Sequence, residues 1–245
     1  MKSKLPNFIA ILGLVFVLIS GTIDLDNLFE YANQSIPNYI NKDNTPANNA
    51  IDNKIATLGR VLFYDKKLSA NNTIACVSCH KQEKAFGDDA TQSTGLSGGL
   101  TGRHSMRLIN SRFSDEEKFF WDERATSLEN QTTQPIQDHV EMGFSGTNVD
   151  GDINDLITKI SAIDYYEQLF DFAFGDAIIT EEKIQLALSQ FIRSIQSFDS
   201  KYDMGRAQVN NPNVDFPNFT AQENFWKTFV YKSAKFKWSW LCRMS

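Results

Sequence analysis

Residues 76–80 read Cys-Val-Ser-Cys-His, and this pentapeptide constrains the chain more than any other feature. Two thiols three positions apart lie on one side of a single turn, where each can form a thioether with one vinyl group of a haem. The adjacent His80 can then reach the iron as an axial ligand. The pattern therefore predicts a covalently bound haem c, held by Cys76 and Cys79 and ligated by His80.

Two other kinds of site share the Cys-x-x-Cys spacing, namely a zinc half-site and a redox dithiol. A tetrahedral zinc site needs two further ligands, but His104, His139 and Cys242 are scattered along the sequence. A thioredoxin-like dithiol lies in a βαβ pattern, which the sequence does not show. The histidine directly after the second cysteine favours haem over both alternatives.

The composition is that of an ordinary folded protein. The 245 residues are 42% hydrophobic and 12% aromatic, with a formal net charge of −6. These values, and the lack of a long polybasic run, argue against a nucleic-acid partner. The 19 phenylalanines suit the apolar wall of a haem pocket, although core packing alone accounts for most of them.

Residues 1–22 have the pattern of a secretory signal peptide. Lys2 and Lys4 precede an apolar run from Phe8 to Ile19, and three small residues follow it. The run is short for a membrane span, although an uncleaved anchor is an alternative because the cleavage pattern is imperfect. Bacterial c-type haem is also attached outside the cytoplasmic membrane, so both signals predict the periplasm.

Helical periodicity dominates the rest of the chain and predicts an all-α fold with long loops. Residues 23–50 are interpreted as a linker, and the glycine-rich residues 87–102 as an irregular loop. Asp52 and Thr180 suit the N-caps of two of the expected helices. The expected helices span residues 51–64, 152–160, 165–174 and 180–198.

Four further motifs surround the haem motif in a fixed order. They are Leu58 to Asp65, then Gly102 to Ser105 with Leu108 to Asn110, then Phe120 to Ala125, and Val140 to Gly143. In order and spacing they resemble the N-terminal haem domain of the bacterial di-haem cytochrome c peroxidases, a family that includes the MauG-type enzymes. The resemblance implies a c-type cytochrome-like haem domain over residues 51–199.

The resemblance also implies a function. Family members reduce hydrogen peroxide to water at the N-terminal haem, with electrons that a small cytochrome c or cupredoxin delivers through a second, C-terminal haem. On this chain, His80 matches the proximal ligand, Glu141 the distal acid and Trp121 the tryptophan between the two haems. The alternatives are an exposed loop acid for Glu141 and a core aromatic for Trp121. A homodimer is a further expectation.

The chemistry supports Glu141 independently of the family. Cleavage of peroxide needs a group that takes a proton from one oxygen and returns it to the leaving oxygen, and a distal carboxylate with a perturbed pKa can do both. Arg124 is expected to anchor Asp122 or a haem propionate. Gln134 and Pro135 are expected to shape the distal pocket.

The chain departs from the family pattern on the distal side. Many members carry a distal histidine in the loop that here contains Leu96. We therefore expect an open sixth position on the iron, with His104 as the nearest other ligand candidate and His139 as a weaker candidate for proton relay. His104 also replaces an asparagine that the family associates with calcium, so a calcium site is doubtful.

The C-terminal sequence departs further from the family pattern. Residues 220–224 resemble the opening of the second haem domain, but a basic, tryptophan-rich sequence follows from residue 229 to residue 245. We interpret residues 200–219 as an interdomain linker and residues 220–245 as a truncated or frameshifted start of that domain, with Cys242 not a haem ligand. A genuine interaction tail is the alternative.

This interpretation predicts one haem c in the chain and impaired transfer of electrons from the donor. Two other functions remain open. One is a non-catalytic mono-haem protein for electron transfer or sensing, and the other is a MauG-like oxidase that modifies a protein substrate.

Overall fold

The computed structural model describes residues 28–114 and 117–241, with side chains as far as Lys232. The predicted signal peptide and Cys242 lie outside this range. The helices, in chain order, are η1 (Ala47–Asn49), α1 (Asn53–Tyr64), η2 (Lys66–Leu68), α2 (Cys76–Cys79), η3 (Gln82–Lys84), η4 (Ser111–Phe113), α3 (Leu128–Thr132), α4 (Ile153–Ser161), α5 (Asp164–Phe174), α6 (Glu181–Ser194), α7 (Lys201–Arg206) and α8 (Ala221–Leu241).

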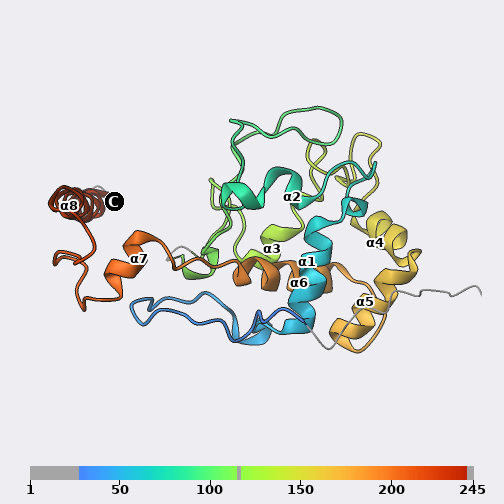
Figure 1. The fold of residues 1–245 in the computed structure, drawn as a ribbon. Helices are drawn as coiled ribbons and strands as arrows, with labels where there is room; N and C mark the ends of the chain where they lie inside the picture. Colours follow the sequence, from blue (N-terminus) through green and yellow to red (C-terminus); the bar gives the residue numbers. More distant parts are fainter. Residues whose placement is uncertain (1–27, 115–116, 242–245) are drawn as a thin grey trace, which may run out of the picture.

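The described part of the chain contains isolated β-bridges but no β-strand, which confirms the predicted all-α class. None of its helices is both long and apolar enough to cross a membrane. Figure 1 shows long loops above the central helices, on the side where α2 lies. These loops position most of the residues that the sequence singled out.

Helices α1 and α6 cross at the centre of the body (Figure 1). Gly59 makes the close approach possible, because a Cβ atom at this position would lie 1.9 Å from the Ala187 carbonyl oxygen. Both predicted N-caps are present: Asp52 accepts hydrogen bonds from two backbone amides of α1, and Thr180 accepts one from the Lys183 amide. Apolar side chains of α1, α4, α5 and α6 share one core.

Helix α6 ends earlier than its apolar stripe predicts. The expected helix over residues 180–198 stops at Ser194. The cause is Asn110, whose backbone amide donates to the Ile195 carbonyl at 2.9 Å and whose side chain exchanges two hydrogen bonds with the backbone of Ser197, each 2.9 Å long. These bonds replace the helical bonds that residues 195–198 would otherwise form. The prediction was wrong at this end because the competing partner lies far away in sequence.

Residues 28–50, where the composition predicts a linker, pack against the helical body. Tyr31 and Asn49 are both buried. The Asn49 amide donates to the Glu129 carboxylate at 2.7 Å and to the Ser189 hydroxyl at 2.9 Å. Glu129 also forms an ion pair with Arg193 on α6. A buried polar network therefore ties this segment to α3 and α6.

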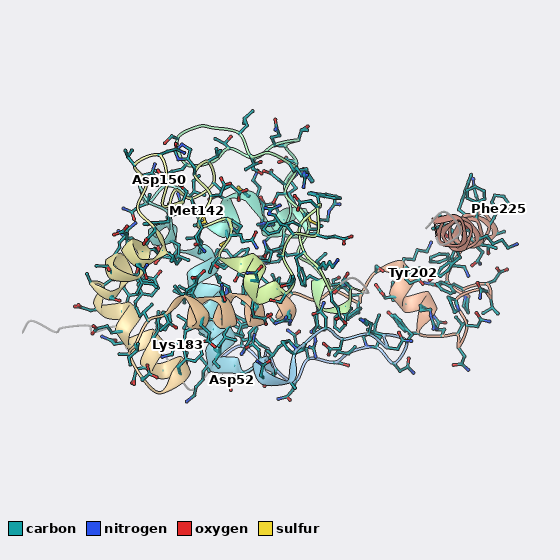
Figure 2. The ribbon with its side chains drawn as sticks, turned by 180° about the vertical axis from the view of Figure 1, so that it is seen from behind. Asp52, Met142, Asp150, Lys183, Tyr202 and Phe225 are labelled. Atoms are coloured by element: carbon teal, nitrogen blue, oxygen red, sulfur yellow. The ribbon has the colours of Figure 1, made fainter. Side chains whose placement is uncertain are left out.

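Helices α7 and α8 lie at one end of the molecule, apart from the α1 and α6 crossing (Figures 1 and 2). A small core holds them together around the buried Phe216, whose backbone exchanges two hydrogen bonds with the Asn224 amide group. Tyr39 donates to Asp203 of α7 at 2.7 Å, which links α7 to the N-terminal segment. The domain boundaries that we set at residues 199 and 219 stay predictions.

Candidate functional site

The Cys-x-x-Cys-His motif forms one helical turn, α2, as its spacing requires. The His80 amide donates to the Cys76 carbonyl at 2.9 Å, and both cysteines are free thiols. Burial raises the pKa of the Cys76 thiol to about 12 and also raises that of Cys79. A reactive redox dithiol needs the opposite shift, toward the thiolate. The raised pKa values of the two thiols therefore argue against a redox dithiol.

The His80 ring is oriented by a backbone carbonyl. Its Nδ1 atom lies 3.0 Å from the Phe86 carbonyl oxygen, so an Nδ1–H donor leaves Nε2 as the free lone pair. Ala85 and Phe86 adopt left-handed backbone conformations, with φ of 57° and 55°, in the turn that aims this carbonyl at the ring. Burial lowers the pKa of His80, which keeps the imidazole neutral as a metal ligand requires.

An aromatic cluster supports His80 from the core side. The Phe63 ring, on α1, lies 6.5 Å from the His80 ring and 5.2 Å from the Phe191 ring on α6, measured between centroids. Phe86 completes the cluster at 6.0 Å from Phe63. The α1 and α6 crossing therefore provides the rigid support of the imidazole. The Ser105 hydroxyl lies beside the ring, 3.2 Å from Nδ1 and 3.4 Å from Nε2.

Glu141 lies in a tight turn that Asp138 organises. The Asp138 carboxylate accepts hydrogen bonds from the amides of Val140 and Glu141 at 2.8 and 2.9 Å. Its carbonyl oxygen accepts from the Gly143 amide at 2.8 Å, and Gly143 closes the turn with a φ of +82° that favours glycine. Figure 2 marks this end of the molecule by Met142 and Asp150.

Glu141 has the electrostatics of a proton-transfer group. Burial and the nearby negative charge of Asp138 raise the pKa of Glu141 to about 7, although the positive charge of Arg124 opposes the shift. The charge of Glu141 in turn contributes to the raised pKa of both Cys76 and Cys79. A carboxyl group that titrates near neutral pH can accept and return a proton.

The loop where many family members carry a distal ligand packs against the Glu141 turn. The Leu96 amide donates to the Val140 carbonyl at 2.8 Å. Two glycines allow this approach: a Cβ atom on Gly95 would lie 2.1 Å from the Val140 carbonyl oxygen, and one on Gly143 would lie 2.4 Å from a Leu96 methyl carbon. The loop thus places the aliphatic side chain of Leu96 beside the turn that carries Glu141.

Trp121 lies at the surface, on a turn over residues 119–125 that hydrogen bonds between Phe119 and Ala125 close. Its side chain is 58% exposed, so it is not a core aromatic. The indole N–H donates to the His104 carbonyl at 2.8 Å, which fixes the ring. An open hollow of about 390 Å³ lies beside it, lined by Thr91, Gln92, Gly102, Arg103, His104 and Trp121.

Arg124 pairs with Asp122, which is one of the two partners that the sequence predicted for it. Its Nη1 atom lies 2.9 Å from one Asp122 carboxylate oxygen, and Arg103 approaches the other at 2.8 Å. The Arg124 Nε–H donates to the Gln134 side-chain oxygen at 3.2 Å. The guanidinium also stacks 3.5 Å above the Phe120 ring centroid.

The two other histidines occupy surface loops. The His139 Nδ1 atom lies 2.8 Å from Asp150, and its side chain is 53% exposed. The His104 Nδ1 atom lies 2.8 Å from the Ala90 carbonyl oxygen. Within residues 28–114 and 117–241, no three His, Cys, Asp or Glu side chains are grouped to hold a metal ion. A zinc site built on the cysteines therefore finds no further ligands in this range.

Three contributions to the site were not foreseen from the sequence. The Phe86 carbonyl that orients His80 is a backbone group, so no side-chain pattern signals it. The Ser105 hydroxyl beside His80 belongs to a recognised motif but had no assigned role. Asp138 carries a signal that could have been used, because an acid three residues before Glu141 suits both an Asx-type turn and a raised pKa.

Residues 53–210 match the sequence family described as di-haem cytochrome c peroxidase. The chain is 32% identical over 158 residues to methylamine utilization protein MauG of Methylophilus methylotrophus, covering 64% of this chain and 44% of that protein. It is 29% identical over 150 residues to the cytochrome c551 peroxidase of Nitrosomonas europaea, covering 61% of this chain and 42% of that protein.

A solved structure supports the same relationship. The crystal structure of a MauG-like protein associated with microbial copper homeostasis matches with a TM-score of 0.63 and 34% sequence identity. The match covers 74% of this chain and 52% of that one. The chain thus spans about half the length, or less, of the relatives that it matches.

Proposed function

This chain belongs to the di-haem cytochrome c peroxidase family, and on that premise we propose that it provides a peroxidatic haem site that reduces hydrogen peroxide to water. One observation carries the proposal. Glu141 is a half-buried acid whose pKa is raised to about 7, its charge acts on both thiols of the haem motif, and the loop beside it carries Leu96 where many family members carry a distal ligand.

The residues of the motif fit a covalently bound haem c. Cys76 and Cys79 lie on one helical turn and form no disulfide, and the Phe86 carbonyl holds His80 Nδ1, so that Nε2 can serve as the ligand atom. When bound, the haem iron supplies the redox chemistry that breaks the peroxide O–O bond. The aromatic cluster behind His80 fixes the direction in which Nε2 points.

Glu141 moves the protons. In its ionised form, the carboxylate takes a proton from one peroxide oxygen, and it returns that proton to the other oxygen as this leaves as water. Two electrons and two protons complete the reduction to two water molecules. Burial keeps competing solvent away from the carboxyl group, and a pKa of about 7 allows both directions of transfer near neutral pH.

Trp121 is the proposed entry point for electrons. Its indole ring is exposed on a fixed turn, held by the His104 carbonyl, and an open hollow lies beside it. An aromatic side chain in this position suits contact with an electron-donating domain or protein, such as a second haem domain, a small cytochrome c or a cupredoxin. We place the protein in the periplasm, with one haem c in this chain.

Steady-state peroxide consumption tests the proposal. The haem-loaded protein, supplied with peroxide and a chemical reductant, is expected to consume peroxide, and Glu141→Gln is expected to lower the rate by a factor of about 10² to 10⁴. Glu167→Gln is the matched control, because Glu167 is an exposed acid on α5, distant in sequence from the site. Equal rates for wild type and Glu141→Gln would contradict the assigned role of Glu141.

A further inference from the structure

Arg124 lies where the two parts of the proposed site meet. One part is the turn over residues 119–125 that carries Trp121, and the other is the segment from Gln134 to Glu141. The Arg124 guanidinium donates to Asp122 on the first part and to Gln134 on the second, at 2.9 and 3.2 Å.

The Trp121 turn needs such a support. Two residues of this turn, Phe120 and Glu123, have left-handed backbone conformations, with φ of 69° and 56°. A bulky residue rarely adopts this conformation unless its surroundings impose it. The Arg124 guanidinium stacks 3.5 Å from the Phe120 ring centroid and forms an ion pair with Asp122. Arg124 therefore contacts the residues on both sides of Trp121.

The Gln134 contact has a defined direction. The Gln134 side-chain nitrogen donates to the Asn130 side-chain oxygen at 2.9 Å, which turns the Gln134 oxygen toward the Arg124 Nε–H. The positive charge of the same guanidinium lowers the pKa of Glu141, whereas burial and the negative charge of Asp138 raise it. A single side chain thus contacts the Trp121 turn and acts on the distal acid.

We propose that Arg124 is a positioning residue that couples the two halves of this site: it holds the turn that carries Trp121 and joins it, through Gln134, to the segment that leads to Glu141. The inference rests on the proposed peroxidase function and deepens it. Since a positive charge stabilises the carboxylate form, Arg124 opposes the effects of burial and Asp138 and keeps part of Glu141 ionised at neutral pH.

The pH dependence of the peroxide reaction tests this coupling. For the haem-loaded wild type, the rate of the reaction with peroxide is expected to rise with pH, with the midpoint of the rise at about pH 7. This rising part of the pH profile, called the limb below, is expected to be absent in Glu141→Gln. In Arg124→Gln the limb is expected to move to higher pH, because the positive charge that lowers the pKa of Glu141 is lost. Below the limb, the rate at a fixed pH then falls.

Arg103→Gln is the matched control. Arg103 pairs with the same Asp122 at 2.8 Å but acts neither on Gln134 nor on Glu141, so its removal is expected to leave the limb in place. Arg124→Lys keeps the charge but loses the planar stack and the fork of donors, so the limb is expected to stay close to its wild-type position.

A second readout does not depend on activity. Hydrogen exchange measured by mass spectrometry is expected to accelerate in the peptide over residues 119–125 in both Arg124 variants, because the Phe119 and Ala125 amides lose the support of their turn. Unchanged exchange in this peptide, or an unmoved limb in Arg124→Gln, would overturn the proposal. If wild type shows no reaction or no limb that depends on Glu141, the proposed function itself fails.

Discussion

The Arg193→Met variant tests the energetics of the polar network that joins the N-terminal segment to α3 and α6. Arg193 is 2% exposed in its side chain, and Glu129 is 16% exposed. The guanidinium reaches both Glu129 oxygens, one of them at 3.1 Å. Methionine has a similar shape but no charge, so the substitution leaves the Glu129 carboxylate buried without its counter-ion. We expect a loss of about 3 kcal/mol of unfolding free energy at pH 7.

The same pair predicts a pH dependence with a definite sign. Burial alone would raise the pKa of Glu129, but the hydrogen bonds and charge of Arg193 outweigh it and lower the pKa to about 2 from an ordinary 4.5. A carboxyl group with a lowered folded-state pKa contributes stability above its unfolded pKa and loses it as the pH falls. The contribution is therefore complete above about pH 5 and decreases by about 2 kcal/mol by pH 3.

Urea denaturation of the haem-loaded protein at pH 7 and pH 3 measures both effects. Arg193→Met is expected to be less stable than wild type at pH 7, and the difference is expected to shrink by about 2 kcal/mol or more at pH 3. The double variant Glu129→Gln with Arg193→Met is expected to recover most of the loss at pH 7, because no charge remains buried. A single variant as stable as wild type at pH 7, or a difference independent of pH, would refute this reasoning.

Three further predictions concern the helices and the site. Gly59→Val is expected to lower the unfolding free energy by about 3 kcal/mol in urea denaturation, because its Cβ atom would collide with the Ala187 carbonyl; Gly102→Val, where no atom lies within 4 Å, is the control and should differ little from wild type. Asp52→Ala removes the N-cap of α1 and is expected to cost about 1 kcal/mol, whereas Asp52→Asn should lose much less in the same assay. Ser105→Ala removes the hydroxyl beside His80 and is expected to change the haem redox potential in a spectroelectrochemical titration. An unchanged potential would show that this contact does not affect His80 as a haem ligand.

The sequence was a good guide to local structure. The haem motif forms a single turn, α2, and the caps at Asp52 and Thr180 begin their helices where the side chains indicate, because capping depends on neighbours within three residues. The end of α6 was not predictable in this way. Asn110 forms hydrogen bonds with the backbone of residues 195–197, although it lies more than 80 positions earlier in the sequence. The periodicity of apolar residues in a helix cannot reveal such a distant partner.

The candidate site shows the same division between local and long-range information. Sequence motifs singled out Cys76, Cys79, His80, Glu141 and Trp121, and the negative charge of Glu141 raises the pKa of both thiols. Trp121 is 58% exposed, and its place between two haems stays a prediction. The backbone carbonyl that orients the imidazole, and the guanidinium that links the two halves of the site, arise only from the folded arrangement of loops.

Ligand binding to the ferric haem-loaded protein tests the central claim most directly. A peroxidatic site with an open sixth position is expected to bind cyanide and to change its absorption spectrum on mixing with hydrogen peroxide, with the peroxide reaction slowed at least 100-fold in Glu141→Gln, consistent with loss of a general base worth about 10² or more. A six-coordinate spectrum that neither cyanide nor peroxide alters would contradict the account and would indicate a closed electron-transfer haem.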